Sequence, residues 1–483
     1  MILLNLYYSA ECSENVTLYP IHDLRKFRTM INIFTKIESN VRSYCRSFPV
    51  VFTKSVGHEV FDSNGNVYID FLSGAGSLNY GHNNPLLKQG LIDYIQQDGI
   101  SHSLDLHTEA KRQFLECFNE IILKPRNLNY KVMFPGPTGT NAVEAAMKLA
   151  RKATRRKTIV HCKNSFHGVT LGSLAVTDNP KFRKVSGVPL TNTYSIPFVC
   201  KFDETAKELD SFVPILNSLD AEGKKPAAII LETVQGEGGI NVANSSWLKK
   251  LFEYAKEHKI LVIVDDIQAG CGRTGTFFSF ERAGLKPDLV CLSKSISGYG
   301  TPMSLVLISP NTDLWEAGEH NGTFRGNNLA FITAAAALSE YWKTDEFENL
   351  VKAKGEFITQ RLEEIVNRYP KLKGKHRGLG FMQGIACASV EIPDKVSRAA
   401  FERGLIIETA GHKGEVIKLL PPLTIDSEAL AKGIDILEDA IYSVLLEEEQ
   451  SKSLSQVANY SSSKKNGTTK IKSPQVDVYK AKF

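Results

Sequence analysis

The chain has 483 residues, of which 42% are hydrophobic and 23% are charged, and its formal net charge is +5. This composition is typical of a globular protein with room for two domains. Residues 451–483 contain seven Lys and one Asp, so the excess positive charge belongs to the C-terminal end, and the rest is close to neutral. The charge distribution therefore argues against a nucleic-acid-binding face, and no motif of a nucleic-acid-binding module accompanies it.

The cysteines and the apolar segments bear on the cellular compartment. The eight cysteines are scattered and form no CxxC pair, which is typical of reduced intracellular thiols. No apolar run approaches the length of a membrane span. Residues 1–10 are apolar but lack the basic region and the cleavage site of a signal peptide. We therefore predict a cytoplasmic protein with no membrane partner.

The N-terminal part predicts an extension followed by short mixed elements. Residues 1–30 show no clear periodicity. Apolar residues three or four positions apart in 30–44 predict an amphipathic helix. Two short strands are predicted at 50–52 and 67–71, joined by the turn at 62–65.

From about residue 86, helices alternate with short apolar strands. Helices are predicted at 141–156 and 246–258. The predicted strands span residues 158–161, 227–231, 260–264, 288–292 and 305–308. Strands that are apolar through most of their length are typical of a parallel sheet covered by helices on both faces. The sequence therefore predicts an α/β domain with a mostly parallel, doubly wound sheet, and a ligand at the carboxyl ends of its strands.

The C-terminal part predicts helices across 329–369, then a turn and strand at 378–384, and a compact α+β region. The acidic run at 447–450 is expected to close the last helix, and the Ser- and Lys-rich residues after it are typical of a disordered tail. The predicted organisation is an N-terminal extension (1–30), the N-terminal part of a small domain (31–85), a large domain (86–345), the C-terminal part of the small domain (346–446) and a disordered basic tail (447–483).

Three segments place reactive groups where a ligand is expected. Asp265 and Asp266 follow one buried strand and Lys294 follows another, while 136–141 opens a helix. A buried carboxylate needs a partner, a buried lysine becomes a nucleophile, and a helix N-terminus suits a phosphate. Each feature alone is more often a surface charge or a helix cap. Together they match the ring nitrogen, the aldehyde and the phosphate of pyridoxal 5′-phosphate.

Several strings resemble those of the class III aminotransferases of fold type I, over about residues 33–446. They lie at 43–52, 78–85, 134–146, 232–241, 265–275 and 321–327. The strings are most similar to the branch that interconverts L-2,4-diaminobutyrate and L-aspartate 4-semialdehyde, as in ectoine biosynthesis. The resemblance implies a large domain that binds pyridoxal phosphate, a smaller α+β domain, and a homodimer or a dimer of dimers.

The resemblance also implies residue roles around the cofactor ring. Lys294 matches the lysine that binds the cofactor aldehyde and then shuttles protons. Asp265 matches the carboxylate that keeps the ring nitrogen protonated, whereas Asp266 is expected to be structural. Gln268 matches a residue near the ring hydroxyl, and Phe166 matches the aromatic residue that stacks on the ring.

Three further positions match residues that hold the cofactor phosphate. Gly139 and Thr140 correspond to the phosphate cup at the helix start. Thr323 corresponds to a residue that reaches the phosphate from the neighbouring subunit, which implies shared active sites.

Two residues match positions that handle substrate carboxylates. Glu237 corresponds to a gate residue that pairs with a carboxylate-binding cation when no substrate is present. Lys418 stands where the family commonly has Arg, and a lysine cannot grip a carboxylate in the planar bidentate manner of arginine. No metal site is predicted, since no cluster has ligand spacing. His82, His167 and Arg273 are expected to hold local structure.

The implied activity is a ping-pong transfer of an amino group between glutamate and an amino-acid semialdehyde, with an amino acid and a 2-oxo acid as partners. One alternative is another class III ω-aminotransferase, acting on 4-aminobutyrate, ornithine or acetylornithine. Lys418 and the string at 134–140 argue against it. A second alternative is an isomerase of the aminomutase type on the same fold. A third is a non-catalytic scaffold recruited through its tail, which intact Lys294 and Asp265 disfavour.

Overall fold

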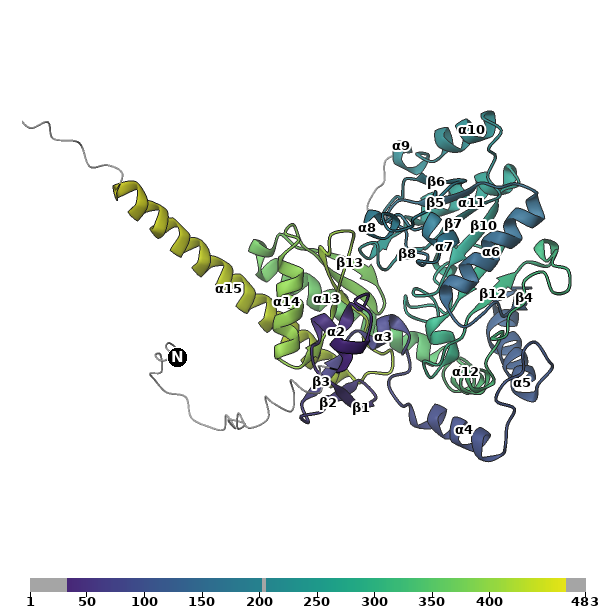
Figure 1. Cartoon of the computed structure of the whole chain (residues 1–483), viewed down its shortest axis with the longest axis horizontal. Coiled ribbons are helices and arrows are strands. Elements are labelled where there is room, and N and C mark those ends of the chain that lie inside the picture. Colours follow the sequence, from purple (N-terminus) through teal and green to yellow (C-terminus); the bar gives the residue numbers. More distant parts are fainter. Residues whose placement is uncertain (1–32, 202–205, 466–483) are drawn as a thin grey trace, which may run out of the picture.

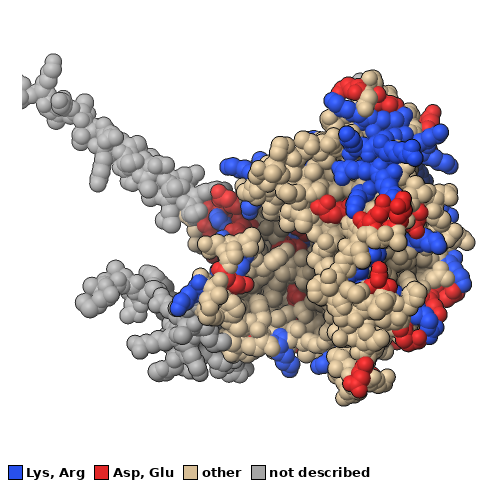
Figure 2. Space-filling view, turned by 45° about the vertical axis from the view of Figure 1, so that its right-hand side comes forward, with Lys and Arg blue, Asp and Glu red and all other residues tan. Residues whose placement is uncertain are grey.

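A computed structural model describes residues 33–201 and 206–465. The predicted extension at 1–30 and the tail beyond residue 465 lie outside these residues. The elements form a large part, built around one extended sheet, and a smaller part to which both the N-terminal and the C-terminal segments contribute (Figure 1). The surface is hollowed between the two parts (Figure 2).

The large part contains a seven-stranded sheet of order β4-β12-β11-β10-β7-β5-β6. Its strands are β4 (Lys131–Met133), β5 (Ile159–Cys162), β6 (Thr193–Ile196), β7 (Ala228–Leu231), β10 (Leu261–Asp265), β11 (Leu289–Leu292) and β12 (Leu305–Ile308). Strands β6, β5, β7, β10 and β11 are parallel, whereas β12 pairs in antiparallel fashion with both β11 and β4. The mostly parallel sheet is therefore as predicted.

The direction of β12 could not be read from its apolar run, because a buried strand has the same pattern in either direction. The connection from β11 to β12 contains only the short 3-10 helix η4 (Lys294–Ser297). A parallel neighbour needs a crossover connection of a dozen or more residues, usually an α-helix that packs on the sheet; the connection at 293–304 contains no α-helix, and β12 pairs antiparallel with β11.

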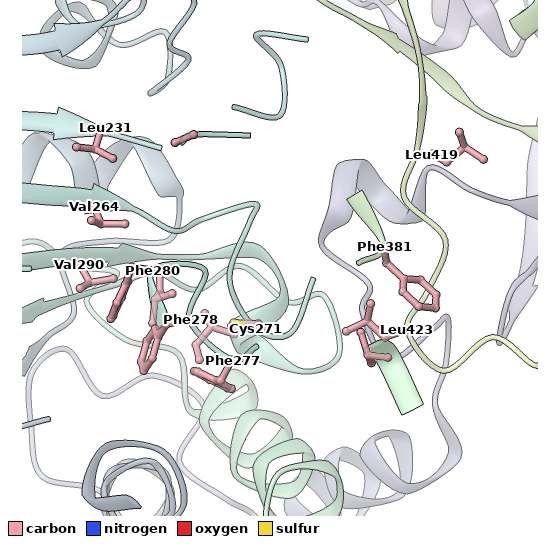
Figure 3. Packing of buried hydrophobic residues seen from close by; sticks show 14 of the residues in the cluster. Leu231, Val264, Cys271, Phe277, Phe278, Phe280, Val290, Phe381, Leu419 and Leu423 are labelled. Carbon is pink, nitrogen blue, oxygen red and sulfur yellow. The ribbon is translucent and has the colours of Figure 1, made fainter. Parts of the chain in front are cut away.

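Helices cover both faces of this sheet. Helix α6 (Gly139–Thr154) buries small and apolar side chains, among them Ala146 and Leu149, against one face. Helix α11 (Ser245–Glu257) buries Trp247 and Leu251 in the core on the other face. Figure 3 shows the aromatic side chains of 277–280 beside the apolar residues of three neighbouring strands. Burial on both faces explains why the strands are apolar throughout.

The smaller part contains two four-stranded sheets. The first has the order β1-β2-β3-β15, formed by β1 (Phe52–Val56), β2 (Glu59–Asp62), β3 (Val67–Asp70) and β15 (Leu405–Ile406). The second has the order β13-β14-β17-β16, formed by β13 (Lys375–Leu379), β14 (Met382–Ala386), β17 (Val416–Leu419) and β16 (Glu408–Ala410). Because β15 pairs with β3, segments from both ends of the chain share one sheet.

The remaining helices connect these sheets or cover them. Helix α12 (Asn328–Tyr341) packs against α4 (Pro85–Gln96) and α5 (Glu109–Cys117). Shorter elements are α2 (Tyr44–Ser47), α3 (Ser73–Gly76), α7 (Leu171–Ala175), α8 (Pro180–Arg183), α9 (Ala206–Leu209), α10 (Val213–Ala221), β8 (Val234–Gln235) and β9 (Asn241–Val242). The C-terminal helices are α13 (Glu346–Arg368), α14 (Ile392–Glu402) and α15 (Ser427–Lys465).

Three local predictions were wrong. Within the described part of the predicted helix at 30–44, only 33–37 and the first residue of α2, Tyr44, are helical, and Ile37 and Val41 are exposed, so no burial stabilises one continuous helix. The turn at 62–65 joins β2 to β3, and the sequence pattern missed β2. Helix α15 continues past Gln450 to Lys465, and no Gly or Pro occurs between Gln450 and Gly467. Figure 1 shows this helix projecting from the molecule.

Arg273 holds the junction between the two parts, in agreement with its predicted structural role. Its side chain is fully buried and donates hydrogen bonds to Asn79 Oδ1 and to the carbonyl oxygens of Pro421 and Phe381. Burial lowers the pKa of the guanidinium to about 9. One side chain therefore connects three segments that are far apart in the sequence.

We expect Arg273→Met to lower the free energy of unfolding by about 2–3 kcal/mol, because it leaves buried acceptors without donors. Denaturant unfolding followed by circular dichroism measures this change. The matched control is Arg155→Met, at an exposed position, which should change stability by less than about 0.5 kcal/mol. Equal effects of the two variants would contradict a structural role for Arg273.

Candidate active site

The polar residues of the candidate site stand at the carboxyl ends of adjacent parallel strands. Glu232 directly follows β7, and Asp265 ends β10. Asp265 is paired with Cys291 of β11, three positions before Lys294. Strand register therefore places two carboxylates and a lysine at one edge of the sheet, where a doubly wound fold binds its ligand.

A cavity of about 190 Å³ lies at this edge. Its lining includes Gly139, Thr140, Phe166, Glu237, Asp265, Gln268 and Lys294, all of them predicted site residues, together with His167 and Glu232. A second cavity of about 1080 Å³ shares Phe166, Glu237 and Lys294 with the first and extends to Tyr44 and Glu408. The structure thus brings together seven of the predicted residues around one cavity, which shares part of its wall with a wider one.

The two other predicted residues lie outside the smaller cavity. Lys418 lies behind Glu237, with its Nζ 2.6 Å from Glu237 Oε1. Thr323 is exposed on the loop that follows β12 and does not line either cavity of its own chain.

Asp265 is held by His167. His167 Nδ1 lies 2.7 Å from Asp265 Oδ2, and the Ile267 N–H donates to Asp265 Oδ1 at 3.2 Å. Burial alone would lower the pKa of His167, but its hydrogen bond to Asp265 and the charge of Asp265 raise it. The histidine therefore fixes the orientation of the Asp265 carboxylate toward the cavity.

Asp266 points away from this cavity. Its carboxylate accepts hydrogen bonds from the hydroxyl and the N–H of Ser279. Burial raises its pKa to about 7. This arrangement is the structural one expected for Asp266 and leaves Asp265 as the carboxylate that faces a ligand.

Lys294 is a buried amine at the centre of the site. Its Nζ donates to the carbonyl oxygen of Ala75 at 2.9 Å. Burial lowers the pKa of Lys294, although the charge of Glu237 acts in the opposite direction. The backbone of Lys294 is left-handed, with φ of 54°, a strained conformation for a side-chain-bearing residue that the surrounding structure must impose. A buried amine with a lowered pKa, held in this way, is suited to act as a nucleophile.

The start of α6 forms an anion-sized recess. The Thr138 N–H donates to Asn141 Oδ1 at 3.1 Å, which caps the helix. Hydroxyl groups of Thr140, Thr170 and Ser173 lie within 2.6–2.9 Å of one another. The first N–H groups of a helix have no partner within it, so together with these hydroxyls they suit a phosphate.

Glycines keep this recess open. A Cβ on Gly139 would lie 2.8 Å from Ile267 Cδ1, and one on Gly168 would lie 2.6 Å from Thr140 Oγ1. His167 Nε2 and Gln268 Oε1 are buried without a hydrogen-bond partner among the described residues. An open recess for an anion, a carboxylate, an aromatic ring and a buried amine fit pyridoxal 5′-phosphate.

Lys418 lies between two carboxylates next to the cavity. It is fully buried on β17, with Nζ 2.6 Å from Glu237 Oε1 and 3.0 Å from Glu408 Oε1. Burial alone would raise the pKa of Glu237, but Lys418 and Lys294 lower it to about 2. Burial raises the pKa of Glu408 despite Lys418. The contact between Glu237 and Lys418 is the pair that the resemblance implies; the contact with Glu408 is additional.

Sequence reasoning missed Glu232, Glu408 and Tyr44. Glu232 carried a usable signal, because it follows a buried apolar strand in the same manner as Asp265. Its pKa is raised to about 7 by burial, and it accepts a hydrogen bond from the Phe166 N–H at 3.0 Å. Tyr44 and Glu408 meet only in the folded chain, where the Tyr44 hydroxyl donates to Glu408 Oε2 at 3.4 Å. No local pattern links residues so far apart.

Within the described residues, no three His, Cys, Asp or Glu side chains are grouped in a way that could hold a metal ion. Over the same part of the chain, no helix has both the length and the apolar character needed to cross a membrane.

Removal of Lys418 would leave two buried carboxylates without their shared cation. We expect Lys418→Met to lower the free energy of unfolding at pH 7 by about 3–5 kcal/mol. In the variant both carboxyl groups have raised pKa values and take up protons on folding, so its stability falls as the pH rises above about 4.3. The deficit relative to wild type should therefore be smaller at pH 5 than at pH 7 in denaturant unfolding.

The control for this variant is Lys413→Met, at an exposed position between β16 and β17. It should be close to wild type at both pH values. A deficit of Lys418→Met that stays constant between pH 5 and pH 7 would mean that the two carboxylates are not the source of the effect.

Comparison with known proteins places the chain in a family. The family model described as Aminotransferase class-III matches residues 41–441. The chain is 54% identical over 424 residues to the diaminobutyrate–2-oxoglutarate transaminase of Sporosarcina pasteurii, covering 87% of this chain and 99% of that protein. It is 55% identical over 414 residues to the enzyme of the same name from Halalkalibacterium halodurans, covering 86% and 97%.

Solved structures share the fold. A transaminase from a marine Virgibacillus superposes with a TM-score of 0.78 at 22% identity, over 87% of this chain and all of that one. The ornithine aminotransferase of Toxoplasma gondii superposes with a TM-score of 0.75 at 25% identity, over 87% and 96%. The predicted fold class and the cofactor, pyridoxal 5′-phosphate, are confirmed. The chain belongs to the class III aminotransferases.

Proposed function

We propose that this transaminase interconverts L-2,4-diaminobutyrate and 2-oxoglutarate with L-aspartate 4-semialdehyde and L-glutamate. Relatives that are more than half identical over nearly their whole length carry the name diaminobutyrate–2-oxoglutarate transaminase. The observation that carries the chemistry is the meeting of Lys294, the Asp265–His167 pair and the start of α6 around one cavity. We also propose that the enzyme works in the cytoplasm and serves the ectoine route.

Lys294 and Asp265 are the proposed catalytic residues. Pyridoxal 5′-phosphate supplies the aldehyde and the electron-withdrawing ring that carry an amino group from one substrate to the other. Lys294 Nζ would hold the cofactor through its aldehyde, and its lowered pKa would suit it to move protons when it is free. Asp265, oriented by His167, would face the ring nitrogen and favour its protonated form.

Other side chains position the same group. Phe166 would pack on one face of the cofactor ring, and the unpartnered Oε1 of Gln268 would accept a hydrogen bond from the ring hydroxyl. Gly139 and Thr140 would hold the phosphate. Glu237 pairs with Lys418 when no carboxylate is bound and exposes this cation to a substrate carboxylate when it turns away.

We further propose a homodimer in which Thr323 reaches the cofactor phosphate of the other subunit. Phe324 beside it is 66% exposed, and its ring lies 5.3 Å from that of His102. Exposed Ile100, Leu104 and Leu106 lie in the same loop as His102. Apolar side chains gathered in this way mark a surface that another chain covers.

The substrate assignment predicts a specific spectroscopic result. The purified protein with pyridoxal phosphate should show a visible band that L-glutamate and L-2,4-diaminobutyrate each convert to the band of the pyridoxamine form. Ornithine is one methylene longer than diaminobutyrate, and 4-aminobutyrate lacks its α-ammonium group. Both should therefore react more slowly, by about tenfold or more. Conversion by glutamate but not by diaminobutyrate would leave the transaminase class intact and reject the substrate.

Covalent attachment of the cofactor tests Lys294 separately. Reduction of the wild type with borohydride should fix one cofactor on the peptide that contains Lys294, as seen by mass spectrometry. Lys294→Ala should fold, bind the cofactor reversibly and yield no modified peptide. Lys256→Ala, an exposed lysine on α11, should behave as wild type. A modified peptide elsewhere would reject the role of Lys294.

The dimer proposal predicts a mass in light scattering of twice that of one chain. Thr323→Ala should keep this mass but bind pyridoxal phosphate about tenfold more weakly, because a hydrogen bond to a charged group is lost. Thr191→Ala, at an exposed position, should bind the cofactor as wild type does. A monomeric wild type, or unchanged affinity in Thr323→Ala, would contradict the shared site.

A further inference from the structure

Glu408 is a buried carboxylate that faces the wider cavity. It begins β16, is 8% exposed and belongs to the cavity wall that also contains Lys294 and Glu237. Glu408 is therefore placed to contact the part of a bound substrate that extends from Lys294 into the wider cavity.

The contacts of Glu408 leave its acceptor capacity unfilled. Oε1 lies 3.0 Å from Lys418 Nζ but accepts no well-aligned hydrogen bond from any described residue. Oε2 has only the long contact of 3.4 Å with the Tyr44 hydroxyl. A buried carboxylate usually accepts several good hydrogen bonds or faces a full cation of its own.

Lys418 is shared unequally between two carboxylates. Its Nζ lies 2.6 Å from Glu237 Oε1 and 3.0 Å from Glu408 Oε1, so the closer partner is Glu237. Arg46 and Lys413 also line the wider cavity, but within the described residues Glu408 has no ion pair other than the one with Lys418. A buried carboxylate without a cation of its own is costly unless a ligand supplies one.

We propose that Glu408 binds the α-ammonium group of L-2,4-diaminobutyrate and of L-aspartate 4-semialdehyde and so selects them over ω-amines without that group; this inference rests on the proposed function. The α-ammonium lies at the end of the substrate away from the reacting carbon, which is the end that faces the wider cavity. Tyr44 borders the same space and limits it. Glutamate reacts through its own α-amine and brings no second ammonium to Glu408.

Two ligands test this contact directly, because 4-aminobutyrate differs from L-2,4-diaminobutyrate only in lacking the α-ammonium group. We expect Glu408→Gln to lower kcat/KM for diaminobutyrate by about 10- to 100-fold, because the variant loses one hydrogen bond between charged groups. The value for 4-aminobutyrate should change by less than about threefold, since it makes no such bond. Glu408→Asp should recover part of the loss, because it keeps the charge.

A binding measurement provides a readout that does not depend on turnover. The enzyme loaded with pyridoxamine 5′-phosphate cannot condense with an amine, so calorimetry on this form reports simple affinity. Wild type should bind diaminobutyrate more tightly than 4-aminobutyrate, and Glu408→Gln should lose most of this difference. The matched control is Glu402→Gln, an exposed glutamate of α14 in the same part of the molecule, which should keep the difference.

Each outcome separates this proposal from the general function. If wild type neither binds nor converts diaminobutyrate, the proposed function fails and Glu408 has no such ligand. A second outcome is that wild type uses diaminobutyrate while Glu408→Gln loses activity equally toward diaminobutyrate, 4-aminobutyrate and glutamate. In that case Glu408 only supports the fold around Lys418, and the proposal is wrong. If the variant keeps the wild-type preference, the proposal is wrong while the function stands.

Discussion

The parallel register of β7, β10 and β11 is the constraint on which the site depends. These strands are apolar on both faces because helices cover both, so polar side chains can stand only where the strands end. The carboxyl ends of parallel strands meet at one edge, and consecutive strands therefore deliver Glu232, Asp265 and Lys294 to a common place. Helix α6 begins at the same edge and adds its unpaired N–H groups. Strand register thus brings these groups to one place, and local contacts such as the one between His167 and Asp265 then set their orientation.

Burial of charge is the second constraint. Each ionisable group at the sheet edge has a partner: Asp265 has His167, Glu237 has Lys418, and Lys294 has a carbonyl oxygen. Paired charges in a poorly hydrated site shift the pKa values of their neighbours strongly, because little water screens them. The same burial that stabilises the fold thus lowers the pKa of Lys294, so a change in packing around this residue would change the pKa of its amine.

The sequence was most informative where local pattern and location coincide. Apolar runs identified five of the seven strands, and polar residues directly after two of them identified Asp265 and Lys294. Strand direction was not accessible, because the apolar run of β12 is the same in either direction. Strand β2 was missed. The part of α15 between Gln450 and Lys465 was also missed, because its sequence lacks the apolar periodicity that predicts a helix. The contact of Tyr44 with Glu408 joins opposite ends of the chain and arises only when β15 pairs with β3. Tertiary pairing of this kind leaves no local signal.

The presence of lysine at position 418 follows from its two carboxylates. A compact ammonium group directs three donors in different directions and can therefore approach Glu237 and Glu408 at the same time. A guanidinium is planar and matches one carboxylate edge-on, so it would favour a single partner. An arginine suits a site in which the cation binds one substrate carboxylate. Lys418, in contrast, contacts two glutamates, so it still has Glu408 as a partner when Glu237 turns away. Under the proposed role of Glu408, Lys418 therefore has two tasks: it holds Glu408 in the cavity wall, and it remains available to a carboxylate when Glu237 moves.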